Sequence, residues 1–238
     1  MQPKHEIQEP DSDSANTSTH NSTAHEAYKH RTEIVPRWAA VIGALAIGLF
    51  YLALPEPLTF GPNWLLLVIE AVLLLRLVFS WITHRPLPHI TIRLLTLATL
   101  GVVTLGLAAS IALLIMTLPT NKQASVLLRS AALLWGANIL VFALWYWEID
   151  GGGPHKRRLS GHKAADLMFP QQVDGNSTGW APTFFDYLFV AFTGATALSP
   201  TDTYPLTPPA KMLMMIEAII SLTVIVLLAA RAVNILGS

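Results

Sequence analysis

The stretch FTGATALSPTDTYPLTPPAK, residues 192–211, decides how the C-terminal part of this chain folds. It joins an apolar segment rich in aromatic residues, 184–191, to a long apolar run, 212–236. This order of parts suits two structures. The stretch is either the turn between two helices that cross a membrane, or part of a segment that enters and leaves the membrane on one side.

Turn chemistry favours the first of these structures. Thr207 can cap a following helix, and Pro208 suits the first helical position because an N–H there has no partner within the helix. Thr201, Asp202 and Thr203 can hydrogen-bond their own backbone in a turn. We therefore expect a proline-stiffened hairpin between two spans and keep the re-entrant segment as the alternative.

The composition indicates a membrane protein. Of the 238 residues, 53% are hydrophobic and 13% are charged, whereas a soluble domain usually carries about 25% charged residues. From Trp38 onward, apolar runs of roughly 20 residues follow one another, and a helix of that length crosses a bilayer. The sequence therefore predicts an all-α, polytopic transmembrane helix bundle with six spans, or alternatively five spans plus a re-entrant pore segment. The predicted spans are Trp38–Leu54, Trp64–Ile82, Ile92–Leu118, Val126–Trp147, Phe184–Leu198 and Met212–Leu236.

Polar and apolar stretches divide the chain into four regions. Residues 1–36 are predicted to be a disordered polar tail in the cytoplasm, because they hold too few large apolar side chains to fold. Residues 37–149 form a four-helix transmembrane region, 150–181 a basic cytoplasmic loop, and 182–238 a C-terminal helical hairpin. The glycines Gly151–Gly153 predict a flexible exit from the fourth span.

Several classes of function are excluded by the residue types present. Lys plus Arg equals Asp plus Glu, 15 each, which argues against a nucleic-acid partner. The chain has no Cys, so disulfides and thiolate metal sites are excluded. It also lacks the common nucleotide-binding, hydrolase and metalloprotease motifs. We therefore expect neither an enzyme nor a cofactor.

Basic residues near the span ends predict the orientation, because Lys and Arg gather on the cytoplasmic side. With six spans and a cytoplasmic N-terminus, the outer flanks hold Lys122 and Lys211. The inner flanks then hold a larger set: Lys29, Arg31, Arg37, Arg85, Arg93, Lys156, Arg157, Arg158 and Lys163. Both termini are therefore expected in the cytoplasm. A segment that re-enters from outside would reverse this distribution.

Ionisable residues inside the spans are expected to face the bundle interior and to pair, because they are costly in lipid. The members of this predicted charge network are Glu70, Arg76, Arg129, Asp186, Glu217 and Arg231. We predict two sets of partners: Arg129 with Glu217 or Glu70, and Asp186 with Arg76 or Arg231. The network is read either as a polar path for protons or cations, or as a structural element that fixes helix packing.

A resemblance covers residues 145–236, in the segments YWEIDGGGP, MFPQ, FFDYLFVAFTGATALSPTDT and AKMLMMIEAIISLTVIVLLAARAVNIL. Their pattern resembles a family of bacterial integral membrane proteins of unknown function. The last two segments are distantly similar to the pore module of two-span potassium channels. The resemblance implies a bacterial inner-membrane protein with a channel-like C-terminal helix pair. By the same resemblance, Thr193, Thr196 and Asp202 would be filter-like residues, and Glu217 would lie on the pore-lining helix.

The stretch departs from a potassium filter at its centre. Such a filter needs successive backbone carbonyls, typically from Thr-Val-Gly-Tyr-Gly. Here Gly194 is the only glycine of the stretch, and Pro200 interrupts it. The sequence thus argues against a potassium-selective filter.

Two functions remain after these exclusions. One is an ion-conducting protein built around the C-terminal helix pair, with a homo-oligomer and a monovalent cation as its partners. The other is a non-conducting structural or accessory membrane protein whose buried charges only hold the bundle together. Both are embedded in a lipid bilayer.

Overall fold

The structure is a computed structural model that describes residues 37–55, 58–59, 62, 64–65, 68, 71, 89–117, 124–196 and 202–236. Its helices are α2 (Arg37–Leu52), α4 (His89–Thr117), α5 (Ala124–Ile149), α6 (Pro154–Leu159), α7 (Phe184–Thr196) and α8 (Pro208–Leu236). The short elements are two 3₁₀ turns, Asp150–Gly152 and Pro170–Gln172, and two strands, β1 (Leu167–Met168) and β2 (Tyr204–Pro205). The predicted tail lies outside the described residues, as does most of the predicted span Trp64–Ile82.

Three of these helices are long and apolar enough to cross a membrane. They are Arg93–Thr117 on α4, Ser125–Gly152 on α5 and the residues that follow it, and Pro208–Ala230 on α8. The chain is therefore mostly helical where it is described, as expected of a multi-pass membrane protein. The structure does not show the six membrane spans that the sequence predicts.

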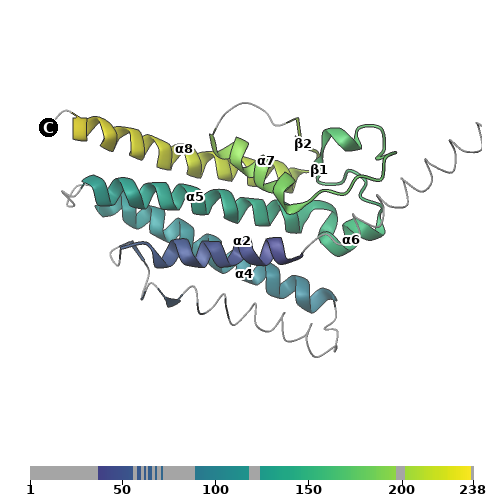
Figure 1. The fold of residues 1–238 in the computed structure, drawn as a ribbon, viewed down its shortest axis with the longest axis horizontal. Coiled ribbons are helices and arrows are strands. Elements are labelled where there is room, and N and C mark those ends of the chain that lie inside the picture. Colours follow the sequence, from purple (N-terminus) through teal and green to yellow (C-terminus); the bar gives the residue numbers. More distant parts are fainter. Residues whose placement is uncertain are drawn as a thin grey trace, which may run out of the picture. The chain divides into compact units, whose positions relative to one another are not determined.

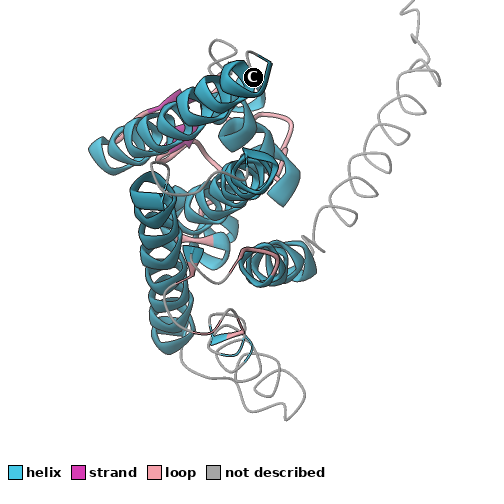
Figure 2. Cartoon of the chain, turned by 90° about the vertical axis from the view of Figure 1, so that its left-hand side faces the viewer, coloured by secondary structure: helices cyan, strands magenta, loops and turns pink. Residues whose placement is uncertain are grey.

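α5 lies at the centre of the described helices. It packs against α2, α4, α7 and α8 (Figures 1 and 2). Of the residues in its most apolar stretch, 56% are buried, against 17% for α8. α8 exposes large apolar side chains such as Met215, Ile219 and Leu222. An apolar helix surface that the protein does not cover must face lipid or another chain.

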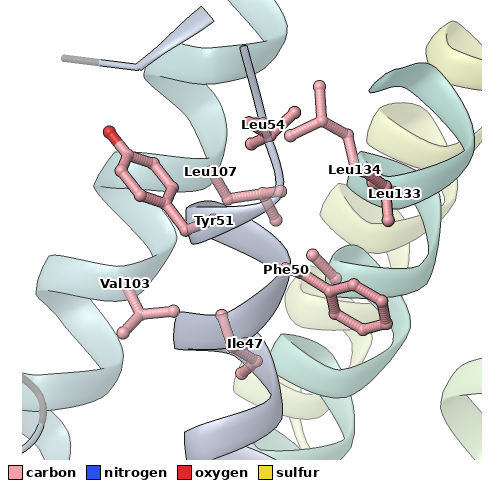
Figure 3. A pocket seen from close by; sticks show the side chains of 9 residues that line it. Ile47, Phe50, Tyr51, Leu54, Val103, Leu107, Leu133 and Leu134 are labelled. Atoms are coloured by element: carbon pink, nitrogen blue, oxygen red, sulfur yellow. The ribbon is translucent and has the colours of Figure 1, made fainter. Parts of the chain in front are cut away.

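α2 packs into the space between α4 and α5, around a small apolar pocket (Figure 3). The pocket is lined by Ile47, Phe50, Tyr51, Leu54, Val103, Leu107, Leu133, Leu134 and Ala137. Gly136 of α5 lies behind it, and a Cβ at this position would stand 3.6 Å from the Phe50 ring. A Cβ there would be in ordinary van der Waals contact with the ring, so the Phe50 side chain packs directly against α5 at Gly136.

Residues 150–183 form a folded unit, the cap, at the C-terminal end of α5 (Figure 1). Gly151, Gly152 and Gly153 have φ values of 60°, 75° and 98°, a left-handed conformation that glycine adopts at little cost. They turn the chain directly from α5 into α6. The sequence predicts a flexible exit at these glycines, and the structure places a turn with positive φ angles there.

The strands β1 and β2 tie the cap to the start of α8. They pair antiparallel, with Leu167 opposite Pro205 and Met168 opposite Tyr204. Leu206 N also donates to Asp166 O at 2.9 Å. Because β2 directly precedes α8, the chain between the two strands leaves the cap and returns to it.

α7 lies in this segment between β1 and β2 and covers only half the length of α5. It has 13 residues, which span about 20 Å at the helical rise. Its first turn is held at the cap, where Tyr187 Oη donates to Asp150 Oδ2 at 2.5 Å. Its last turn reaches the middle of α5, where Trp135 Nε1 lies 3.5 Å from Ala195 O.

The structure therefore does not show the fifth crossing that the sequence predicted for Phe184–Leu198. The helix is short, and the cap and β2, which flank it in the chain, meet at the same end of α5. The prediction depends on hydropathy, turn chemistry and the distribution of basic residues, none of which shows where the two ends of a short apolar segment are attached.

Candidate functional site

The most unusual polar side chain in the described helices is Glu217 of α8, which is fully buried. Tyr146 of α5 donates a hydrogen bond from its hydroxyl to Glu217 Oε2. The other carboxyl oxygen, Oε1, has no hydrogen-bond partner among the described residues. A buried carboxyl group with one neutral donor is costly when ionised, because nothing replaces its lost hydration.

Gly194 of α7 covers the same carboxyl group. A Cβ built on Gly194 would stand 3.1 Å from Glu217 Oε2, which is tighter than ordinary van der Waals contact. The sequence places its one glycine of α7 where the helix passes the carboxyl group of α8. A larger residue there would require the carboxyl group or a helix to shift by a few tenths of an ångström, so glycine suits this close approach of the two helices.

One helical turn further along α8, Ser221 makes a second polar contact with α7. Its hydroxyl donates to Ala195 O at 2.6 Å. It also accepts a hydrogen bond of 2.9 Å from Trp135 Nε1 of α5. We call the residues that join these three helices the polar junction: Trp135, Tyr146, Gly194, Ala195, Glu217 and Ser221.

Asn138 adds an unsatisfied amide to the same face of α5, between Trp135 and Tyr146. Its side chain is fully buried, and neither its Nδ2 nor its Oδ1 atom has a partner among the described residues. Ser110 of α4 is also fully buried, with an unpartnered hydroxyl. Buried polar atoms without protein partners are commonly satisfied by ordered water.

The filter-like residues Thr193 and Thr196 lie within α7 rather than in a loop after it. Their hydroxyls donate to carbonyls one turn back in the same helix, Thr193 to Phe189 O at 3.0 Å and Thr196 to Phe192 O at 2.8 Å. Asp202 is exposed, just before β2. The structure therefore does not bring these three side chains together.

The predicted pair between Arg129 and Glu217 is not formed. Arg129 is exposed near the N-terminal end of α5, whereas Glu217 contacts Tyr146, which is 17 residues or about 25 Å further along that helix. Glu70 and Arg76 lie outside the described residues, and so does the side chain of Arg231. Of the acidic residues in the predicted charge network, Glu217 is the one that the structure describes as buried inside the bundle. It contacts a tyrosine.

Asp186 has a local role at the start of α7. Its Oδ2 atom accepts hydrogen bonds from Thr183 N at 2.6 Å and Thr183 Oγ1 at 2.7 Å. Thr183 followed three residues later by Asp186 thus satisfies groups at the helix N-terminus, where a negative charge is also favourable. Its predicted partners are outside the described side chains, so the pairing with Arg76 or Arg231 stays a prediction.

The cap holds a buried cation that the sequence reasoning missed. Arg157, which we assigned to a basic loop, is 1% exposed. Its Nη1 atom donates to Asp150 O at 2.8 Å and Trp147 O at 3.0 Å, and it lies 4.0 Å from Asp150 Oδ2. Its guanidinium carbon stands 4.9 Å from the centre of the Trp147 ring and 5.1 Å from that of Tyr187. We call these four residues the arginine anchor.

Asp150 completes the anchor by accepting hydrogen bonds from three directions. Its Oδ1 atom accepts from Asp166 N at 3.2 Å and Leu167 N at 3.1 Å, while its Oδ2 atom accepts from Tyr187 Oη. The anchor thus fixes the end of α5, the start of α7 and β1 relative to one another. In the sequence, Arg157 cannot be told from Arg158 beside it, because burial of one and exposure of the other depend on tertiary contacts.

His162 lies next to the anchor in a left-handed conformation, with φ of 55°. Burial lowers the pKa of its imidazole below the usual value, and the nearby positive charges of Arg157 and Arg158 lower it further. Its Nδ1 atom has no partner among the described residues. The cap therefore favours the neutral form of this side chain.

The polar junction could hold a proton or a water molecule, but it offers few ligands for a larger ion. Within the described residues there is no group of three or more His, Cys, Asp or Glu side chains that could bind a metal ion. No protein-family model, curated protein or solved structure matches the chain.

Proposed function

We propose that this multi-pass membrane protein conducts monovalent cations through its C-terminal part, with α7 as a re-entrant element. The observation that carries the proposal is the path of the chain between β1 and β2. It leaves the cap, forms α7 down to the middle of α5 and α8, and returns to the cap. Backbone that enters a membrane without crossing it is tolerated where protein or a water-filled path surrounds it.

The direction of α7 supports a path for cations. Its N-terminus is at the cap and its C-terminus is level with the middle of the two long helices. The carbonyl end of a helix carries a partial negative charge, which favours a cation nearby. A short helix that ends inside the bilayer therefore lowers the cost of a cation at that depth.

We place the cap on the cytoplasmic side. Lys156, Arg158, Lys163 and Lys211 are exposed on or beside it, and short segments rich in Lys and Arg stay in the cytoplasm. If α7 is re-entrant and the span predicted at residues 64–82 is counted, the chain crosses the membrane five times. The N-terminus then stays cytoplasmic, as the sequence predicts, and the C-terminus lies on the opposite side.

Cation flux into liposomes that contain the purified full chain tests this function. We expect flux of K⁺ or Na⁺ above that of protein-free liposomes, and a several-fold reduction in Gly194→Ala, whose added methyl group presses on Glu217. The matched control is Gly101→Ala on α4, where a Cβ meets nothing within 4 Å; it should conduct like the wild type. Flux no greater than in protein-free liposomes, for both ions and both signs of membrane potential, rules the function out.

A non-conducting structural protein is the second candidate. This function is favoured because the hydroxyls of Thr193 and Thr196 already donate hydrogen bonds to carbonyl oxygens of their own helix. Absence of flux from protein whose folding is verified supports this second function.

A further inference from the structure

Glu217 is the one acidic side chain that the structure describes as fully buried between the long helices. Its hydrogen bond from Tyr146 satisfies Oε2, and Oε1 faces no donor among the described residues. An ionised carboxylate in this position would have exchanged several water molecules for a single phenol hydroxyl.

Among the described side chains, no cation contacts Glu217 from the elements that pack around it. α5 presents Tyr146, and α7 presents Gly194. The two titratable groups of α7, Asp186 and Tyr187, are bonded at its other end, to Thr183 and Asp150. On α8 itself, Lys211 is exposed, and the side chain of Arg231 lies outside the described residues.

We propose that Glu217 is a proton-binding site, and that loss of this proton separates α7 from α8. In the folded structure the proton is on the carboxyl group, which is then neutral and suits its surroundings. When the proton passes to water, the carboxylate must recover hydrogen-bond donors, and the nearest protein donor is already used. Water then has to enter the polar junction.

Gly194 links this entry of water to the position of α7. The 3.1 Å between Glu217 Oε2 and a Cβ at Gly194 shows that α7 lies directly on the carboxyl group. A water molecule fits between them only if α7 moves away.

This inference adds a means of regulating the proposed conduction. Only the expected effect of Glu217 ionisation on flux rests on the proposed function. If α7 forms the conducting path, ionisation of Glu217 changes flux because α7 moves. The protonation state and the movement can each be measured without flux, so failure of the proposed function is distinguishable from failure of this inference.

Infrared difference spectra between wild type and Glu217→Gln test the proton site directly. Gln has the same shape and retains an acceptor for Tyr146. At neutral pH we expect the wild type alone to show the C=O stretch of a protonated carboxylic acid, and this band should disappear as the pH is raised. In Tyr146→Phe the band should shift, because its hydrogen-bond donor is lost. Carboxylate bands from Glu217 at neutral pH would overturn the inference.

Alkylation of a single cysteine tests the movement. The chain has no Cys, so Ala195→Cys, at a position 2% exposed, reports opening of the junction. The rate at which this cysteine is alkylated should rise with pH several-fold more when Glu217 is present than in the double variant Ala195→Cys with Glu217→Gln. The double variant corrects for ionisation of the thiol itself. Equal pH dependence in both backgrounds would show that ionisation leaves α7 in place and would end the proposed coupling.

Discussion

Thr207 Oγ1 donates a hydrogen bond of 2.6 Å to Asp166 Oδ1, and this contact fastens the start of α8 to the cap. The other oxygen of Asp166 accepts a hydrogen bond of 2.9 Å from Gly151 N, at the end of α5. One carboxylate thus joins the end of one long helix to the beginning of the next. The chain segments on either side of α7 are therefore attached at the same end of both helices.

Single cysteines can show this path in a membrane, since the natural chain has none. Ser177→Cys lies in the cap before α7, and Asp202→Cys lies after α7; both positions are exposed. With a re-entrant α7, a membrane-impermeant maleimide applied to sealed vesicles labels both cysteines from the same side. Ser125→Cys, exposed at the other end of α5, should be labelled only from the opposite side. Labelling of positions 177 and 202 from opposite sides would restore the six-span topology.

Loss of the buried arginine should be far more costly than loss of its exposed neighbour. Arg157→Gln leaves Asp150 and two carbonyl oxygens without their cation, and we expect the free energy of unfolding to fall by about 3–5 kcal/mol. Arg158→Gln removes an exposed charge and should change the same quantity by less than about 0.5 kcal/mol. Thermal unfolding of the purified protein in detergent measures both variants. Equal effects would mean that the arginine anchor does not hold the cap.

The hydroxyl of Tyr187 should contribute to stability through Asp150. Tyr187→Phe removes the donor to Asp150 Oδ2 and keeps the ring that packs on Arg157. We expect a loss of about 1.5–3 kcal/mol, which is typical of a buried hydrogen bond to a charged group. Tyr204→Phe is the matched control, because Tyr204 is 57% exposed. Chemical unfolding followed by tryptophan fluorescence compares the two, and a silent Tyr187→Phe contradicts the prediction.

The two helical glycines Gly194 and Gly101 should respond differently to alanine. In the middle of a helix, Gly→Ala contributes about 1 kcal/mol of helix propensity. Gly101→Ala should gain most of this, because no atom lies within 4 Å of its new Cβ. At Gly194 the Cβ meets Glu217 Oε2 at 3.1 Å, so the gain should be cancelled or reversed. The difference between the two unfolding midpoints measures the closeness of α7 and α8, and similar gains would argue against this contact.

His162 should make the protein less stable in mild acid. Its pKa is lowered in the folded state, first by burial and then by Arg157 and Arg158, while in the unfolded chain it is near 6.5. Below that pH the unfolded state binds the proton more readily, so stability is lost as the pH falls from about 6.5 toward the folded pKa. His162→Asn tolerates the left-handed backbone and should lack this part of the pH dependence. The difference in unfolding midpoint between the two proteins across this range is the measurement, and parallel curves would contradict it.

The helical character could be predicted from the sequence, since it follows from local properties. Long apolar runs bounded by proline and glycine predict the helices at α2, α4, α5 and α8, and Pro208 begins α8 as expected. Thr207 precedes it at the capping position, with its carbonyl bonded to Lys211 N at 3.1 Å. Its hydroxyl, however, reaches Asp166, which is 41 residues away.

The candidate site could be predicted only in part. The sequence predicts Glu217 as a buried site because an acidic residue in an apolar run is unusual, but it predicts a cation as the partner. Tyr146 gives no such signal, because an aromatic residue near a span end is typical of an anchor at the membrane surface. A neutral carboxyl group can accept a hydrogen bond from a neutral donor. It therefore needs no cationic partner, although the predicted pairs each join an acidic residue to a basic one.

The amino-acid order by itself determined which segments are helical and apolar, because hydrophobicity and helix-breaking residues act over a few neighbouring positions. Only the tertiary structure decided that the chain segments on both sides of α7 are attached at the same end of α5, that Arg157 is buried and that Glu217 meets Tyr146. Each of these depends on contacts between residues far apart in the chain: β1 with β2, Arg157 with Tyr187, and α5 with α8. A short apolar helix can cross or re-enter with the same composition, and the positions at which its two ends are attached determine which of these it does.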